Sequence, residues 1–106
     1  MQPTTILSDW YIIDFERDGA PEEVQVAWGI VKEDPSGRWS PGNYSCTSPI
    51  QREVTEEGVL YAITGNSIYQ LDGPGKRITM PTKTILALRG GYAPPEIMAS
   101  QSMQKD

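Results

Sequence analysis

The 106-residue chain has no histidine, one cysteine and no long run of apolar residues. A single cysteine, Cys46, cannot form an intrachain disulfide, and without histidine the chain lacks the commonest base for a nucleophile and a frequent zinc ligand. No segment approaches the roughly 18 consecutive apolar residues of a membrane span, and the first ten residues do not resemble a signal peptide. We therefore expect one soluble, cytoplasmic domain over residues 1–106, without a cofactor or a protein-bound metal.

Acidic residues outnumber basic ones by 14 to 9, and they are unevenly distributed. Residues 1–34 contain eight acids against two bases, a net charge of −6, whereas residues 35–106 have a net charge of +1. An acidic surface disfavours nucleic acid, whose phosphates attract Lys and Arg, and favours a protein partner with a basic surface. The alternative is that these charges only keep the protein soluble. The candidate partner-binding acids are Asp9, Asp14, Glu16, Asp18, Glu22, Glu23, Glu33 and Asp34.

The first half of the chain predicts three strands. Residues 6–15 favour a strand, and the apolar run at residues 10–13 suits one that is covered on both faces. Residues 24–30 alternate in the way that is typical of a half-buried strand. Asp-Pro-Ser-Gly at residues 34–37 predicts the turn to a third strand at 43–48. We expect the polar residues 16–21 to interrupt the pattern between the first two strands.

The second half predicts three more short strands and then a helical end. Strands are expected at residues 59–64, 67–71 and 78–80, after a polar loop at 53–58, with Gly-Asn as the hairpin turn between the first two. Residues 81–89 predict a short helix, and Pro-Glu at residues 95 and 96 begins a second. The fold class is therefore α+β: a small antiparallel β-sheet or partly open β-barrel of about six short strands in residues 1–80, followed by one or two short C-terminal helices in residues 81–103.

No pattern predicts catalysis, so we expect a protein that is not an enzyme. Cys46 lies within a predicted strand, where burial is expected, although Arg38 and Arg52 leave a reactive thiol as an alternative. Asp14 lies between two apolar residues and is the best candidate for one member of an acid–base carboxylate pair. The alternative for Asp14 is an exposed position on an edge strand.

Two further features are candidates for binding. The segment Gly-Pro-Gly at residues 73–75 precedes Lys76 and Arg77, which could gather around an anion, although the spacing differs from that of a phosphate-binding loop. The alternative is an ordinary solvated turn. Trp39 lies beside the turn at residues 34–37 and is expected to be exposed and to face a partner. Core packing is expected to explain most of the other aromatic residues.

The segments WGIVKEDPSGRWSPGNYSCTSPI (residues 28–50), TGNSIYQLDG (64–73), LRGG (88–91) and PEI (95–97) resemble a family of short proteins of unknown function. Its members occur in Pseudomonas and related bacteria and in their prophages. The resemblance covers residues 26–97 and depends on glycines, prolines and aromatic residues that serve the structure. It implies a bacterial or phage context and a cytoplasmic location, and it implies no activity.

Three functions are consistent with these observations. The first is a non-catalytic inhibitor, such as a phage-encoded anti-defence factor of the anti-CRISPR type, whose acidic face blocks a basic surface of another macromolecule. The second is a nucleotide-binding sponge or sensor that uses Lys76 and Arg77. The third is an immunity protein paired with a toxin. The sequence leaves the oligomeric state open, a dimer included.

Overall fold

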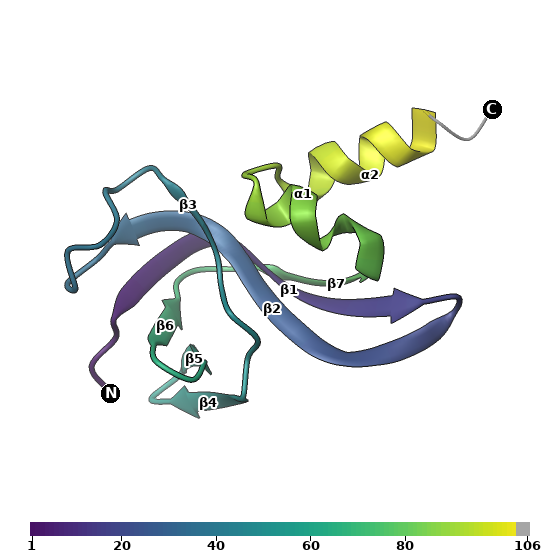
Figure 1. Cartoon of the computed structure of the whole chain (residues 1–106). Helices are drawn as coiled ribbons and strands as arrows, with labels where there is room; N and C mark the ends of the chain where they lie inside the picture. The colour runs from purple at the N-terminus through teal and green to yellow at the C-terminus, as the bar shows by residue number, and fades with distance from the viewer. Residues whose placement is uncertain (104–106) are drawn as a thin grey trace.

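The computed structural model describes residues 1–103, in which a seven-stranded mixed sheet is followed by short helices (Figure 1). The sheet is not closed, and the helices follow it in the chain. The predicted α+β class is therefore confirmed. The elements are β1 (Thr5–Arg17), β2 (Ala20–Glu33), β3 (Tyr44–Cys46), β4 (Arg52–Glu56), β5 (Val59–Ile63), β6 (Ile68–Leu71), β7 (Lys76–Pro81), a 3-10 turn (Thr82–Thr84), α1 (Ile85–Arg89) and α2 (Pro94–Met103).

The long hairpin of β1 and β2 dominates the molecule (Figure 1). Its strands have 13 and 14 residues and extend into the polar segment 16–21 from both sides, so the interruption predicted there is present but shorter than expected. The turn consists of Asp18 and Gly19 alone, whose φ angles of 52° and 80° are typical of a two-residue hairpin turn. The segment is polar because the end of the hairpin lies in solvent.

β1 is the central strand because both of its edges are paired. One edge pairs antiparallel with β2, and the other pairs in parallel with β6 at Thr5–Leu7 and with β7 at Tyr11–Glu16. The strand order is β3-β2-β1-β6-β5-β4, with β7 beside β1. The two parallel pairings make the sheet mixed, whereas the sequence predicts only antiparallel neighbours.

A β-bulge at Asp9 changes which face of β1 each side chain occupies. Between the pairs Ser8↔Ile30 and Tyr11↔Trp28, β1 advances by three residues while β2 advances by two, and the φ of Asp9 is 48°. The extra residue breaks the strict alternation of a strand. An odd-numbered position before the bulge and even-numbered positions after it therefore face the same side of the sheet.

Two hydrophobic clusters lie on opposite faces of the hairpin. This arrangement confirms that the apolar run at residues 10–13 is covered on both faces. The cluster shared with β5 and β6 contains Leu7, Trp10, Ile12, Ala27, Val31, Ala62, Tyr69 and Leu71. The cluster shared with β7 and the helices contains Ile13, Phe15, Val26, Trp28, Met80, Leu88 and Ile97.

The glycine-rich loop at residues 73–75 covers the ring of Trp10. The indole Nε1 donates a hydrogen bond of 3.1 Å to the carbonyl oxygen of Gly73, and Trp10 is only 8% exposed. A Cβ atom on Gly75 would overlap the indole ring. Gly75 is therefore required by the close approach of the loop to an aromatic side chain.

β4 lies where the sequence predicts a loop at residues 53–58. Its mostly polar side chains suit the outer edge of the sheet, where one side of the strand remains in water. Glu57 and Gly58, with φ angles of 52° and 79°, form the turn to β5. The prediction of a loop is wrong because polar composition does not separate an edge strand from a loop.

An ion pair joins β4 to β7, two strands that are not hydrogen-bonded through their backbones. Both guanidinium nitrogens Nη1 and Nη2 of Arg77 donate to the carboxylate of Glu53, the first at 3.0 Å. This contact with Arg77 lowers the pKa of Glu53 below its usual value. The ion pair thus links β4, at the outer edge of the sheet, to β7, which is paired with β1.

We expect Gly75→Ala to lower the free energy of unfolding by about 1–3 kcal/mol, the usual cost of overpacking. The added methyl group must displace the Trp10 ring. Gly65→Ala is the matched control, because its Cβ would meet only Gln51 Nε2 at 3.5 Å. Urea unfolding followed by tryptophan fluorescence measures both variants. Equal stability of the two would contradict the close packing of this loop on Trp10.

We expect Glu53→Gln to lower the free energy of unfolding at pH 7 by at most about 1 kcal/mol, since the pair is partly exposed to solvent. Because the pKa of Glu53 is lowered in the folded state, the pair stabilises the protein above about pH 4.3 and loses this effect as the pH falls. Denaturant unfolding of the wild type and of Glu53→Gln should therefore differ less at pH 3 than at pH 7. A constant difference at both pH values would exclude this charge effect.

Candidate functional site

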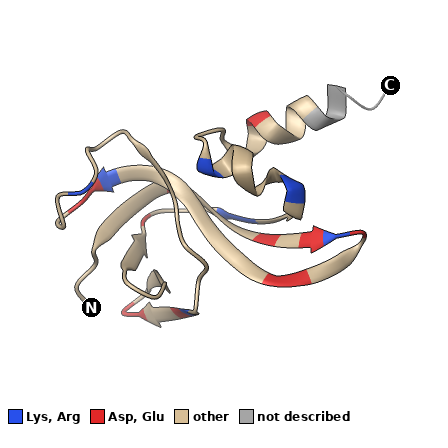
Figure 2. Cartoon of the chain, viewed as in Figure 1, with Lys and Arg blue, Asp and Glu red and all other residues tan. Residues whose placement is uncertain are grey.

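The structure separates the eight predicted partner-binding acids into three groups (Figure 2). Glu33 and Asp34 lie at the other end of β2, ten residues from Glu23, which corresponds to roughly 30 Å of extended strand. Asp9 lies at the bulge in the middle of β1. The remaining five lie around the hairpin turn, in a segment of residues 14–25 that we call the arm: Asp14, Glu16, Asp18, Glu22 and Glu23.

The arm has a net charge of −4, because Arg17 is its only basic residue. Arg17 Nε lies 2.9 Å from Glu22 Oε1, and Gln25 Nε2 donates a hydrogen bond of 2.9 Å to Asp14. The other four carboxylates of the arm have no salt-bridge partner within residues 1–103. Among the described residues, four of the five carboxylates of the arm are therefore outside any salt bridge, although the charge of Asp14 acts on nearby Arg77.

The arm is held at its base by β7 and by the 3-10 turn. β7 pairs with β1 as far as Glu16↔Pro81, and the hydroxyl of Thr82 donates a hydrogen bond of 3.1 Å to the backbone oxygen of Glu16. Phe15 points to the helical side and is buried there. Because side chains alternate along a strand, burial of Phe15 directs Asp14 and Glu16 away from that cluster.

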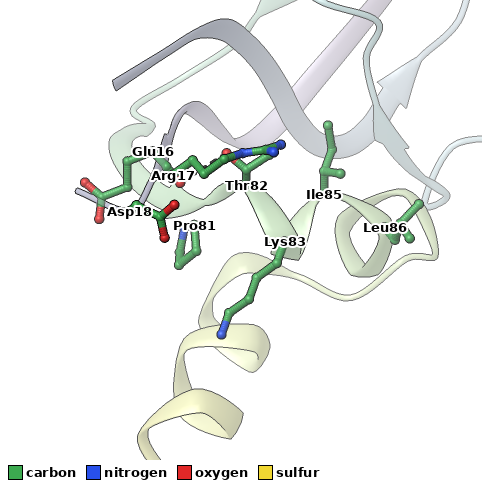
Figure 3. Close-up of a pocket in the computed structure, with 8 residues that line it drawn as sticks. All are labelled: Glu16, Arg17, Asp18, Pro81, Thr82, Lys83, Ile85 and Leu86. Carbon is green, nitrogen blue, oxygen red and sulfur yellow. Dashed lines mark hydrogen bonds between the residues drawn. The ribbon is translucent and has the colours of Figure 1, made fainter. Parts of the chain in front are cut away.

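A groove of about 710 Å³ lies between the arm and the start of the helical segment (Figure 3). Glu16, Arg17 and Asp18 come from the arm. Figure 3 shows the side chain of Arg17 extending toward Thr82 and Ile85, whereas the carboxylate of Glu16 points away from the helical segment. Charged residues lie on both walls of the groove, because Lys83 comes from the helical segment, where it accompanies three apolar residues. The residues from the helical segment are Pro81, Thr82, Lys83, Ile85 and Leu86.

Sequence reasoning missed this groove, although one signal was present. The helix predicted at residues 81–89 has apolar side chains at 85, 86 and 88, and these positions point in different directions around so short a helix. They cannot all face one core. In the structure Leu88 is buried, Ile85 is half-buried and Leu86 is 79% exposed.

Asp34 organises the loop that presents Trp39. Its carboxylate accepts hydrogen bonds from the backbone N–H groups of Ser36, at 3.1 Å, and Trp39, at 2.7 Å, and from the hydroxyl of Thr5 at 3.2 Å. Burial acts to raise the pKa of Asp34, but these hydrogen bonds outweigh it and hold the pKa below its usual value. Asp34 thus supports the loop internally, while Trp39 is 40% exposed, as expected.

Lys76 and Arg77, the predicted anion-binding pair, do not converge. The guanidinium of Arg77 is bound by Glu53, which raises the pKa of Arg77. Lys76 is the next residue along β7, so its side chain leaves the opposite face of the strand. There it lines a shallow hollow of about 320 Å³ beside Asp9 and Trp10.

The aromatic residues near β3 serve packing. Trp28 stacks on Tyr44 with ring centroids 6.3 Å apart and meets Tyr11 edge-on at the same distance. Tyr44 in turn donates a hydrogen bond of 2.8 Å to the backbone oxygen of Arg89, which links β3 to α1. Cys46 packs against the same cluster, and burial raises the pKa of its thiol, a shift opposed in part by Arg89.

Comparisons of the chain with protein-family models, with curated proteins and with solved structures found no match. The resemblance to a bacterial and prophage family therefore stays a prediction. In the part of the chain that the structure describes, no three His, Cys, Asp or Glu side chains are grouped so that they could hold a metal ion. None of the described helices is both long enough and apolar enough to cross a membrane.

We expect Asp34→Asn to lower the free energy of unfolding at pH 7 by about 1–2 kcal/mol, because hydrogen bonds to a charged acceptor are lost. Since the folded-state pKa of Asp34 is lowered, this contribution is present above about pH 4 and is lost as the pH falls. Amide hydrogen exchange should become faster at Ser36 and Trp39. Glu33→Gln removes the same charge from the neighbouring exposed residue and should leave both properties unchanged; equal effects of the two would contradict this role of Asp34.

Proposed function

We propose that this protein is a non-catalytic binding protein whose acidic arm covers a basic surface on another protein. The observation that carries the proposal is the net charge of −4 within the twelve residues 14–25. Of the five carboxylates in this segment, only that of Glu22 forms a salt bridge among the described residues. The turn end of the arm also projects beyond the last pair between β1 and β7, so a partner can reach it (Figure 2). A surface of this kind supports recognition by charge.

Electrostatics explains why the arm would act as a unit. The carboxylates lie on two paired strands around one tight turn, within a few residues of one another. At physiological ionic strength the screening length is about 8 Å, so the fields of such neighbours add at the surface of a partner. A concentrated field increases the rate of association with a basic surface and disfavours acidic partners.

An anti-defence factor of the anti-CRISPR type is one form of this function. A nucleic-acid-binding surface is basic because it binds phosphates. Carboxylates on a projecting arm compete with phosphates for the same Lys and Arg side chains, so they would block such a surface without any chemical step. An immunity protein bound to a basic toxin would use the same physics.

We expect a triple variant of the arm, Glu16→Gln, Asp18→Asn and Glu23→Gln, to lose the partner. Affinity capture from a bacterial lysate, with mass spectrometry, identifies proteins that the wild type retains, and the purified partner then gives a dissociation constant. Three charges fewer should weaken binding at 0.1 M salt by about tenfold or more and should reduce its salt dependence. Asn is well suited to position 18, because it tolerates the positive φ found there.

The matched control removes three charges elsewhere, by Asp9→Asn, Glu33→Gln and Glu57→Gln. These residues are exposed and lie outside the arm. The control should bind the partner within about threefold of the wild type, since its charges lie beyond a screening length from the arm. Stronger loss with the control than with the arm variant, or binding that is indifferent to salt, would contradict the proposal.

A further inference from the structure

The two outer strands of the sheet are protected to different degrees. An edge strand presents unpaired N–H and C=O groups to which another strand can pair, and proteins often shorten such strands or use proline to block them. β3, at one end of the strand order, has three residues and lies between Pro41 and Pro49. β4, at the other end, has five residues and contains no proline (Figure 1). β4 is therefore the edge that is more open to a further strand.

The pairing of β4 with β5 determines which backbone groups of β4 remain available. Glu56 and Val59 flank the two-residue turn between these strands, so they exchange backbone hydrogen bonds with each other. Such pairs alternate along an antiparallel ladder, and Glu53 and Thr55 therefore direct their N–H and C=O groups away from β5. Within residues 1–103, no other strand or loop forms backbone hydrogen bonds with this outer edge.

We infer that β4 pairs antiparallel with β4 of a second copy of this chain, with the two Val54 residues opposite each other at a two-fold axis. In this register, Glu53 of each copy exchanges backbone hydrogen bonds with Thr55 of the other copy. Arg52 lies opposite Glu56 of the other copy, and the symmetry makes this contact twice. The inference goes beyond the proposed function and does not depend on it.

Charge selects this register over the two adjacent ones. The outward backbone groups alternate along the strand, so the second copy can move only in steps of two residues if these groups are to meet. Such a step places Glu53 opposite either Glu53 or Glu57 of the other copy. Like charges directly opposite each other destabilise a strand pair, whereas opposite charges stabilise it. Of the three registers, only the one centred on Val54 brings opposite charges together without facing like charges.

The side chains that would form the two ion pairs are accessible. Arg52 is exposed and has no salt-bridge partner within residues 1–103. Glu56 is also exposed, and its Oε1 lies 2.6 Å from the ammonium group of Met1. A carboxylate can accept several hydrogen bonds, so its second oxygen can bind Arg52 of the other copy. The charge of Glu53 is already compensated by Arg77.

The acidity of the whole chain opposes self-association only weakly at this edge. The arm accounts for −4 of the net charge of −5. β4 is connected through β5 and β6 to the Thr5–Leu7 end of β1, whereas the arm lies at the other end of that strand. Exposed charges separated by more than about 8 Å are largely screened at physiological ionic strength. The charges on β4 itself therefore dominate its pairing.

The first test is the oligomeric state of the wild type. Pairing of five residues makes a small interface, so we expect a dissociation constant on the order of 100 µM. Sedimentation velocity from about 20 µM to about 1 mM should show the sedimentation coefficient rising toward that of a dimer. Amide hydrogen exchange at Glu53 and Thr55 should slow over the same range, because only the dimer bonds these N–H groups. A wild type that stays monomeric throughout would overturn the inference.

A charge exchange tests the register. We expect Arg52→Glu and Glu56→Arg each to weaken dimerisation by about tenfold or more, because each places like charges opposite each other twice. An equimolar mixture of the two variants should dimerise again, since one then has Glu and the other Arg at both positions. Lys83→Glu is the matched control, at an exposed residue outside β4, and should dimerise within about threefold of the wild type. A mixture no better than the separate variants would contradict the register.

Thr55→Pro tests the backbone pairing. Proline lacks the N–H group, and an edge strand tolerates it where that group faces solvent. Because β5 does not use the N–H of Thr55, we expect this variant to keep the circular dichroism spectrum of the wild type and to lose the dimer. Thr55→Val retains the N–H group and should keep the dimer. A folded Thr55→Pro protein that still dimerised like the wild type would show that another surface is used, and it would overturn the assignment to β4.

Discussion

Pairing along both edges of β1, together with packing on both of its faces, is the constraint on which the rest of the structure depends. β2 occupies one edge, and β6 and β7 share the other, so β1 connects the small sheet to the strand that leads into the helices. The bulge at Asp9 lies between these two pairings. The bulge allows Leu7 and Trp10 to pack in the same cluster, although a regular strand without a bulge would place them on opposite faces.

The same alternation that builds the core also places the charge. Ile13 and Phe15 must face the helices, so Asp14 and Glu16 between and beyond them must face the other way. A slip of one residue in the pairing with β2 would bury two carboxylates and expose two large apolar side chains, at a cost far above the marginal stability of a small domain. The position of the acids on the arm is therefore determined by the same strand pairing that builds the core.

The predictable parts of this fold are those determined by local pattern. The apolar run at residues 10–13 indicated a strand covered on both faces, and the glycines and prolines after residue 80 indicated the helices. The sequence did not reveal that Lys76–Pro81 returns to pair with β1, because parallel pairing joins residues more than 60 positions apart. Nor did the sequence show that the carboxylate of Asp34 accepts hydrogen bonds from its own loop. Eight acids in one third of the chain suggested one face, but long strands carry Glu33 and Glu23 to opposite ends of the molecule.

The arm and the groove have a common structural support. β7 pairs with β1 up to Glu16 and continues directly into the turn that carries Thr82, Ile85 and Leu86. The position of the arm relative to this segment is thus set by one short stretch of backbone and by the hydrogen bond from Thr82 to the backbone oxygen of Glu16. Such preorganisation reduces the entropy that a binding site loses when its ligand arrives. In the proposed binding role, the arm would therefore present its charge in a fixed position relative to the rest of the sheet.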